Sequence, residues 1–125
     1  MLDAFAKQNF DVFAGSEVFL LDNMRNGGKG CITATGNINP CPIANVYRNW
    51  RSSEADKLQA GITATRKVVQ KQPMIPALKT AVAHFGNDAH WKTCRPPLVE
   101  LTSNQEEELI RDLKAIGFTM PGLTG

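Results

Sequence analysis

The sequence predicts an α/β fold that opens with a strand–helix–strand unit and continues as helices. A short apolar run at residues 12–14 stops at a glycine, and apolar residues at helical spacing fill residues 17–26. The pair Gly27 and Gly28 then ends that helix where a left-handed cap is needed, and a β-branched run follows at residues 31–35. Because a helix joins the two strands, the crossover predicts that they pair in parallel.

The carboxyl ends of the two predicted strands are where such folds bind ligands. The first strand is followed by Gly15, Ser16 and Glu17, and the second carries Thr33 and Thr35 near its end. Each also has a structural explanation, since glycine suits a turn, serine caps a helix and glutamate favours the positive end of the helix dipole. Side chains alternate along a strand, so one threonine is expected to face the ligand side, and either could do so.

The rest of the chain is predicted to be helical. The predicted helices cover about residues 42–50, 53–71, 75–86 and 103–117. Ser53 with Asp56 and Ser103 with Glu106 have the spacing of capping pairs at the starts of the second and the last of these helices. No repeat, linker or low-complexity tract interrupts them.

The composition is that of an ordinary globular protein, with 42% hydrophobic and 21% charged residues. A net charge of +2 leaves no electrostatic footprint for nucleic acid or a membrane surface. The three cysteines, Cys31, Cys41 and Cys94, form no disulfide framework and no C-x-x-C motif, which favours reduced thiols and a cytoplasmic location. Ligands at metal spacing are missing too, so we expect no metal site.

A family resemblance becomes specific in the first half of the chain. Gly15-Ser16-Glu17, followed by the run GGKGCITATGN at residues 27–37, resembles the seventh and eighth βα region of the dihydrodipicolinate synthase / N-acetylneuraminate lyase family. Later, PMIPALK at residues 73–79 resembles the family's proline-containing helix start, and RPPL at residues 95–98 resembles its C-terminal end. The order and spacing of these motifs carry the resemblance over nearly the whole chain.

The resemblance implies a particular architecture. The chain would be the last two βα units of a TIM (β/α)8 barrel at residues 1–50, followed by a C-terminal helical extension at residues 51–125. A complete barrel needs roughly 250 residues, and this chain has 125. It therefore resembles a fragment that is mostly helical by residue count, from a parent that is a homo-oligomer, a tetramer by the resemblance.

The resemblance also implies the chemistry of the parent. Family members are class I aldolases in which a strand-six lysine forms a Schiff base with pyruvate or a related 2-keto acid, without a further cofactor, and a strand-five tyrosine relays protons. Both residues would lie upstream of Met1, so we expect no catalytic residue here and no activity of the isolated chain. Lys29 precedes its strand and Lys79 lies on a helix of the extension, so neither is a credible substitute.

Five residues are expected to bind substrate in the complete enzyme: Ile32, Gly15, Glu17, Ser16 and Thr33. By the resemblance, Ile32 would present its backbone carbonyl beside the Schiff base. An acidic residue at the position of Glu17 contacts substrate hydroxyls in the family's sialic acid lyases. Gly15 would let the backbone pass close to the keto acid.

Two other functions are compatible with the sequence. One is a dehydratase of a 2-keto-3-deoxy sugar acid on the same scaffold, which differs only in its second substrate. The other is a non-catalytic helical interaction module that has kept the tail of the fold. A coding sequence in register upstream of Met1 would favour the enzyme, and a short gene would favour the module.

Overall fold

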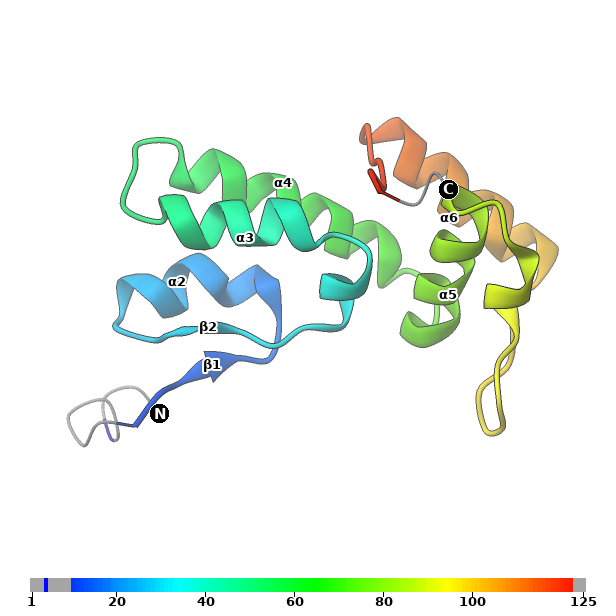
Figure 1. Cartoon of the computed structure of the whole chain (residues 1–125), viewed down its shortest axis with the longest axis horizontal. Coiled ribbons are helices and arrows are strands. Elements are labelled where there is room, and N and C mark those ends of the chain that lie inside the picture. The colour runs from blue at the N-terminus through cyan, green and yellow to red at the C-terminus, as the bar shows by residue number, and fades with distance from the viewer. Residues whose placement is uncertain (1–3, 5–9, 123–125) are drawn as a thin grey trace. The chain divides into compact units, whose positions relative to one another are not determined.

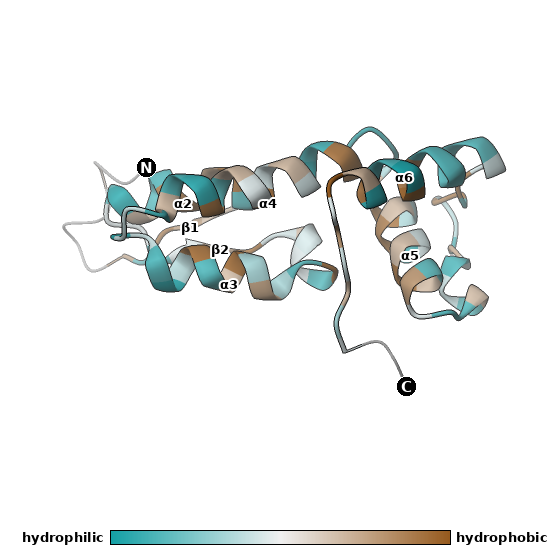
Figure 2. Cartoon of the chain, turned by 90° about the horizontal axis from the view of Figure 1, so that it is seen from above, coloured by the Kyte–Doolittle hydropathy of each residue, from teal (hydrophilic) through white to brown (hydrophobic). Residues whose placement is uncertain are grey.

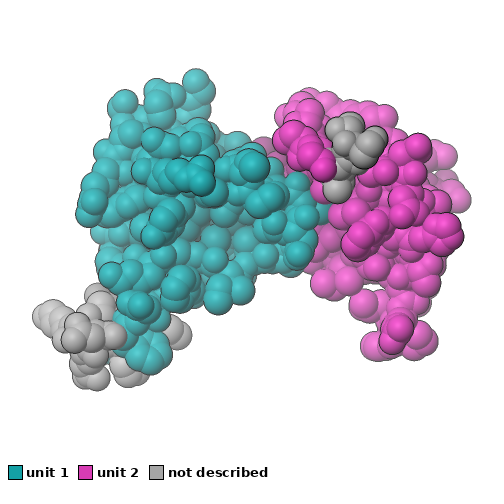
Figure 3. All heavy atoms as spheres, in the orientation of Figure 1, with its two compact units in different colours: residues 1–63 teal, residues 64–125 magenta. Residues whose placement is uncertain are grey.

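The computed structural model describes residue 4 and residues 10–122. It divides into two compact units, Met1–Thr63 (unit 1) and Ala64–Gly125 (unit 2) (Figure 3). The boundary falls inside the long helix α4, Ala55–Val69, so each unit holds a part of it.

Unit 1 opens with the predicted strand–helix–strand unit. Its elements are β1 (Phe13–Ala14), the 3-10 helix η2 (Glu17–Phe19), α2 (Leu20–Arg25) and β2 (Gly30–Cys31). The strands are parallel and in register, with Phe13 opposite Gly30 and Ala14 opposite Cys31, as the crossover predicts. Figure 1 shows α2 running alongside the strand pair.

The turn between α2 and β2 explains the double glycine. Gly27 has a φ of +90°, so the predicted left-handed cap is present there. Gly28 is needed for its size instead, because the buried side-chain amide of Asn23 lies where a Cβ would be. That amide donates to the carbonyls of Val12 (3.0 Å) and Gly30 (2.9 Å), so one side chain of α2 ties the turn to both strands.

The predictions for the strands and the first helix are partly wrong in extent. The first strand is only Phe13–Ala14, and the second ends at Cys31 instead of continuing to residue 35. A 3-10 helix, η3 (Ala34–Asn37), replaces its end, and a 3-10 turn, η2, replaces the first turn of the α-helix predicted at residues 17–26. The carbonyl of Thr35 accepts bonds from the amides of two later residues (3.0 and 2.8 Å), which turns the backbone toward the next helix.

Helix α3, Pro40–Asn49, packs on α2 and begins with proline in its first turn (Figure 1). The core of unit 1 is formed by the apolar faces of α2, α3 and the first part of α4. Its buried members are Leu20, Leu21, Met24, Val46, Ala55 and Ile62. The helix that connects the two strands, α2, contributes Leu20, Leu21 and Met24 to this core.

The predicted capping pair at the start of α4 is wrong. The helix begins at Ala55, and the carboxylate of Asp56 accepts two hydrogen bonds from the guanidinium of Arg25, at 2.9 and 2.8 Å. This bidentate pair joins α4 to α2 within unit 1. An available partner of opposite charge thus determines the orientation of Asp56.

Unit 2 contains α5 (Met74–Phe85), the 3-10 helix η4 (Ala89–Lys92) and α6 (Ser103–Ala115). The capping box of α6 lies one residue before the predicted one, since Thr102 and Gln105 bond reciprocally in place of Ser103 and Glu106. Figure 2 shows α6 as largely hydrophilic, in keeping with a helix that buries only one stripe. The buried residues of α5 and α6 include Ala77, Leu78, Ala81, Leu109, Ile110 and Leu113.

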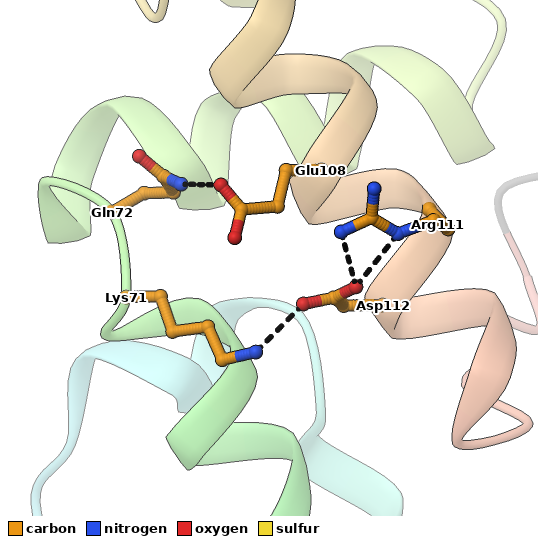
Figure 4. A network of polar contacts seen from close by, with 5 residues as sticks. All are labelled: Lys71, Gln72, Glu108, Arg111 and Asp112. Atoms are coloured by element: carbon orange, nitrogen blue, oxygen red, sulfur yellow. Dashed lines mark hydrogen bonds and ion pairs between the residues drawn. The ribbon is translucent and has the colours of Figure 1, made fainter.

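Polar contacts fasten α6 to the segment that follows α4 (Figure 4). Lys71 donates to Asp112 at 2.8 Å, and Arg111 bonds the other oxygen of the same carboxylate at 3.0 and 3.1 Å. Gln72 donates to Glu108 one turn earlier on α6, at 3.0 Å. Among the described residues, no helix is long and apolar enough to cross a membrane.

Candidate site at the carboxyl ends of the parallel strands

The turn after β1 places Glu17 inside unit 1. Ser16 is the N-cap of η2, with extended backbone angles and a side-chain oxygen that accepts from the amide of Val18 at 3.4 Å. Glu17 therefore occupies the first turn of the 3-10 helix, and 0% of it is exposed. A buried carboxylate requires hydrogen-bond donors around it.

The hydroxyl groups of two threonines that follow β2 supply these donors. Thr33 donates to Oε2 of Glu17 at 2.5 Å, and Thr35 donates to Oε1. The hydroxyl of Ser16 lies 3.4 Å from Oε2, and the two threonine hydroxyls are 3.4 Å apart. Alternation along a strand predicts one inward threonine, but both face the carboxylate, because Thr35 belongs to η3 and not to a strand.

Sequence reasoning missed Gln59, which holds the same turn from α4. Its side-chain nitrogen donates to the carbonyls of Glu17 (2.9 Å) and Val18 (3.2 Å), and its oxygen accepts from the amide of Leu21 (3.1 Å). The signal available in the sequence is its position three residues before the buried Ile62, on the inward side of an amphipathic helix. A glutamine there needs backbone partners.

The remaining predicted site residues lie on the open side of the same turns. Ile32 is 75% exposed, and its amide donates to the carbonyl of Ala14 at 2.9 Å. A Cβ added to Gly15 would meet no atom within 4 Å, and the left-handed glycines of the described chain do not include Gly15. The structure therefore shows open space beside Gly15 and no left-handed φ there.

A groove of about 490 Å³ runs along β2 on the side that faces α3. Phe13, Cys31, Thr33, Ile43 and Tyr47 are among the residues that line it. Phe13 is half exposed there, although its strand reads as an apolar core segment. The groove begins at the strand ends, since Thr33 belongs both to its lining and to the cluster around Glu17.

Burial raises the pKa of the Cys31 thiol, and the nearby negative charge of Glu17 raises it further. Cys31 is thus a half-buried neutral thiol in the wall of the groove, whereas Cys41 is exposed. In the described part of the chain no group of three His, Cys, Asp or Glu side chains is placed to hold a metal ion.

One lysine, Lys29, lies among the residues that line the groove. Lys29 is exposed and precedes β2, at the opposite end from Glu17. Lys79 lies over the ring of Trp91 in unit 2, 5.7 Å from its centroid. Lys71 and Lys92 are paired with carboxylates of α6. Lys7, another lysine considered from the sequence, falls outside the described residues.

A parallel strand pair with a carboxylate and hydroxyls gathered at its carboxyl ends is a portion of an α/β fold of the class that binds ligands at that edge. The model of the dihydrodipicolinate synthetase family matches residues 2–116. The chain therefore belongs to the dihydrodipicolinate synthetase family.

Individual relatives agree with this assignment. The chain is 28% identical over 119 residues to the probable 2-dehydro-3-deoxy-D-pentonate aldolase YjhH of Escherichia coli K12, covering 90% of this chain and 38% of that protein. It is also 28% identical to the 4-hydroxy-tetrahydrodipicolinate synthase of Thermodesulfovibrio yellowstonii, covering 86% of this chain and 37% of the synthase. The chain thus spans about 38% of the length of such relatives.

Solved structures show the same fold. N-acetylneuraminate lyase from Fusobacterium nucleatum matches with a TM-score of 0.79 at 24% identity, covering 92% of this chain and 40% of the lyase. YagE, a prophage protein of the dihydrodipicolinic acid synthase family from E. coli K12 in complex with pyruvate, matches with a TM-score of 0.78 at 22% identity, covering 90% of this chain and 39% of YagE. These are (β/α)8-barrel enzymes, so the chain has the fold of a part of that barrel.

Proposed function

We propose that this chain supplies the last two βα units of a (β/α)8 barrel, at residues 1–50, and its helical extension, at residues 51–125. The complete protein is a cytoplasmic, oligomeric lyase or synthase that joins or cleaves a carbon–carbon bond next to a pyruvate-like 2-keto acid. The observation that carries the proposal is the parallel pair β1–β2, whose carboxyl ends bring Glu17 and Thr33 together. Membership of the family supports the reaction class.

The chain would form one wall of the keto-acid pocket. Gly15, Ser16, Glu17, Ile32 and Thr33 stand at the strand ends, where barrels of this kind bind substrate. Ile32 would offer its backbone carbonyl beside the imine carbon, and the open space at Gly15 would admit the keto acid. Pyruvate bound to YagE and to the Fusobacterium lyase supports a ligand of this class.

The groove along β2 supports the proposal that another part of the complete protein packs against it. In a closed barrel the last strand pairs with the first, and a helix covers their outer face. Phe13 of β1, Cys31 of β2 and Tyr47 of α3 line this groove. The preceding portion of the protein would fill it and would supply the lysine whose amine condenses with the ketone, releasing water.

The experiment is to join this chain to the preceding part of YjhH at the boundary of the aligned regions and to assay cleavage of 2-dehydro-3-deoxy-D-pentonate to pyruvate. The proposal predicts pyruvate release by the hybrid and none by the YjhH part alone. Ile32→Pro is the control inside the chain, since proline cannot donate to the carbonyl of Ala14 and one hydrogen bond between the strand ends is lost. A folded hybrid that releases no pyruvate would count against the proposal.

A further inference from the structure

We infer that Glu17 acts as a positioning residue: its buried carboxylate holds Thr33 and Thr35 and thereby fixes the main chain of Ile32 at the rim of the site. The inference rests on the proposed function for its consequence in the enzyme. The structural part stands on contacts within unit 1 alone.

Glu17 could either contact a substrate or position the turn after β2, and the exposed fractions favour positioning. The residue is 0% exposed, whereas Ile32, the sequence neighbour of Thr33, is 75% exposed. Both carboxylate oxygens are engaged by threonine hydroxyls. A substrate hydroxyl that approached Glu17 would have to displace these donors, whereas one that approached the strand end would meet the Ile32–Thr33 main chain first.

The two threonines hold different parts of the turn after β2. Thr33 directly follows Ile32, and its carbonyl accepts from the amide of Gly36 at 3.2 Å. The carbonyl of Thr35 accepts from the amides of Ile38 (3.0 Å) and Asn39 (2.8 Å), which lead into α3. By bonding both hydroxyls, Glu17 sets the start and the middle of this turn from the neighbouring strand end.

Gln59 fixes the other side of Glu17. It bonds the backbone of η2 at Glu17 and Val18 and that of α2 at Leu21, so the turn that carries the carboxylate is itself held by α4. The path runs from α4 through η2 to η3 by hydrogen bonds whose donors and acceptors are all identified. Charge-assisted bonds of a buried carboxylate are stronger than bonds between neutral groups, so this link is the firmest in the path.

The first test uses the complete 125-residue chain and amide hydrogen exchange. Thr35→Val keeps the shape of the side chain but removes the donor, and we expect the amides of Gly36, Ile38 and Asn39 to exchange about tenfold faster. Thr35→Ser restores the hydroxyl and should restore slow exchange. Thr80→Val in α5 is the matched control for a buried threonine in unit 2 and should leave these three amides unchanged.

The second test measures whether the position of the Ile32 main chain affects the binding of pyruvate. In the YjhH hybrid, Thr35→Val should raise the pyruvate concentration for half-maximal borohydride trapping about tenfold, and Thr35→Ser should reverse this. If Thr35→Val unfolds unit 1, amide exchange and pyruvate half-saturation are measured on Thr33→Val instead. Faster exchange without a change in half-saturation would overturn the positioning role, as would unchanged exchange. A hybrid that traps no pyruvate with the native chain would refute the proposed function instead and leave the exchange result intact.

Discussion

Gly28 lies directly against the side chain of Asn23: a Cβ at residue 28 would stand 2.3 Å from the amide atoms of that asparagine. The same amide bridges the carbonyls of Val12, directly before β1, and Gly30, the first residue of β2. Only a residue without a side chain leaves Asn23 in this position. Gly28 thus leaves the room that Asn23 needs to hold β1 and β2 together.

Gly28→Ala should therefore destabilise unit 1 by about 2 kcal/mol or more, because displacing Asn23 breaks two buried hydrogen bonds of about 1 kcal/mol each. Urea unfolding followed by Trp50 fluorescence in a Trp91→Phe background measures the effect. Gly61→Ala is the matched control, since its Cβ meets nothing within 4 Å and it lies within α4. It should stabilise by about 0.5–1 kcal/mol, so equal effects of the two changes would contradict this explanation.

Glu17→Gln should reduce kcat/KM of the YjhH hybrid for its cognate substrate about tenfold or more, equivalent to roughly 1.4 kcal/mol. Glutamine has a similar size but only one acceptor oxygen, so it cannot accept from both Thr33 and Thr35 as the carboxylate does. Imine formation should survive, because the lysine comes from the other part. If steady-state kinetics stay unchanged while the melting temperature falls, Glu17 serves stability alone.

Thiol reactivity reports on the charge of Glu17. Cys41 is exposed and should be alkylated by iodoacetamide before Cys31, whose pKa is raised mainly by burial and also by Glu17. A raised pKa means less thiolate at a given pH, so Cys31 should react faster in the Glu17→Gln variant. Mass spectrometry after timed alkylation gives both rates, with Cys41 as the internal reference. If the alkylation rate of Cys31 does not change, burial alone raises the pKa of this thiol.

Acid should weaken unit 2 through Asp112. The hydrogen bond from Lys71, and then that from Arg111, hold the pKa of this carboxyl below its ordinary value. The folded state therefore favours the charged form: its stabilising effect is present above the unfolded pKa of about 3.9 and is lost as the pH falls through the lower folded pKa.

Asp112→Asn should consequently flatten the acid dependence of unit 2, followed by Trp91 fluorescence in a Trp50→Phe background. Asp56→Asn is the comparison, because Asp56 pairs with Arg25 in unit 1 and its own lowered pKa should act on the Trp50 signal instead. An acid profile of Asp112→Asn identical to that of the native chain would contradict the role of the Lys71 contact.

The parallel strand pair, the glycine cap at Gly27 and the order of the helices follow from local patterns and could be predicted from the sequence. The length of β2 could not. A β-branched run favours a strand, but the bonds that the Thr35 carbonyl accepts and the bond that its hydroxyl donates to Glu17 favour a 3-10 turn. Tertiary hydrogen bonds override β propensity there.

The sequence could predict where the candidate site lies but not how its side chains are oriented. The strand ends identify Glu17 and Thr33, but only the folded chain shows that the carboxylate turns inward and that Gln59 bonds the backbone carbonyl of Glu17 from 42 residues away in sequence. The capping pair of α6 was displaced by one residue because Thr102 and Gln105 offer the same chemistry as their neighbours. Contacts distant in sequence and near-equivalent local choices are what a single sequence leaves open.

The most direct test of the central claim is to map where pyruvate attaches. The isolated chain and the YjhH hybrid are each incubated with pyruvate and borohydride, digested and analysed by mass spectrometry. The account predicts no adduct on the isolated chain, and in the hybrid an adduct on a lysine of the YjhH part only. A stoichiometric pyruvyl adduct on Lys29, or on any other lysine of this chain, would contradict it.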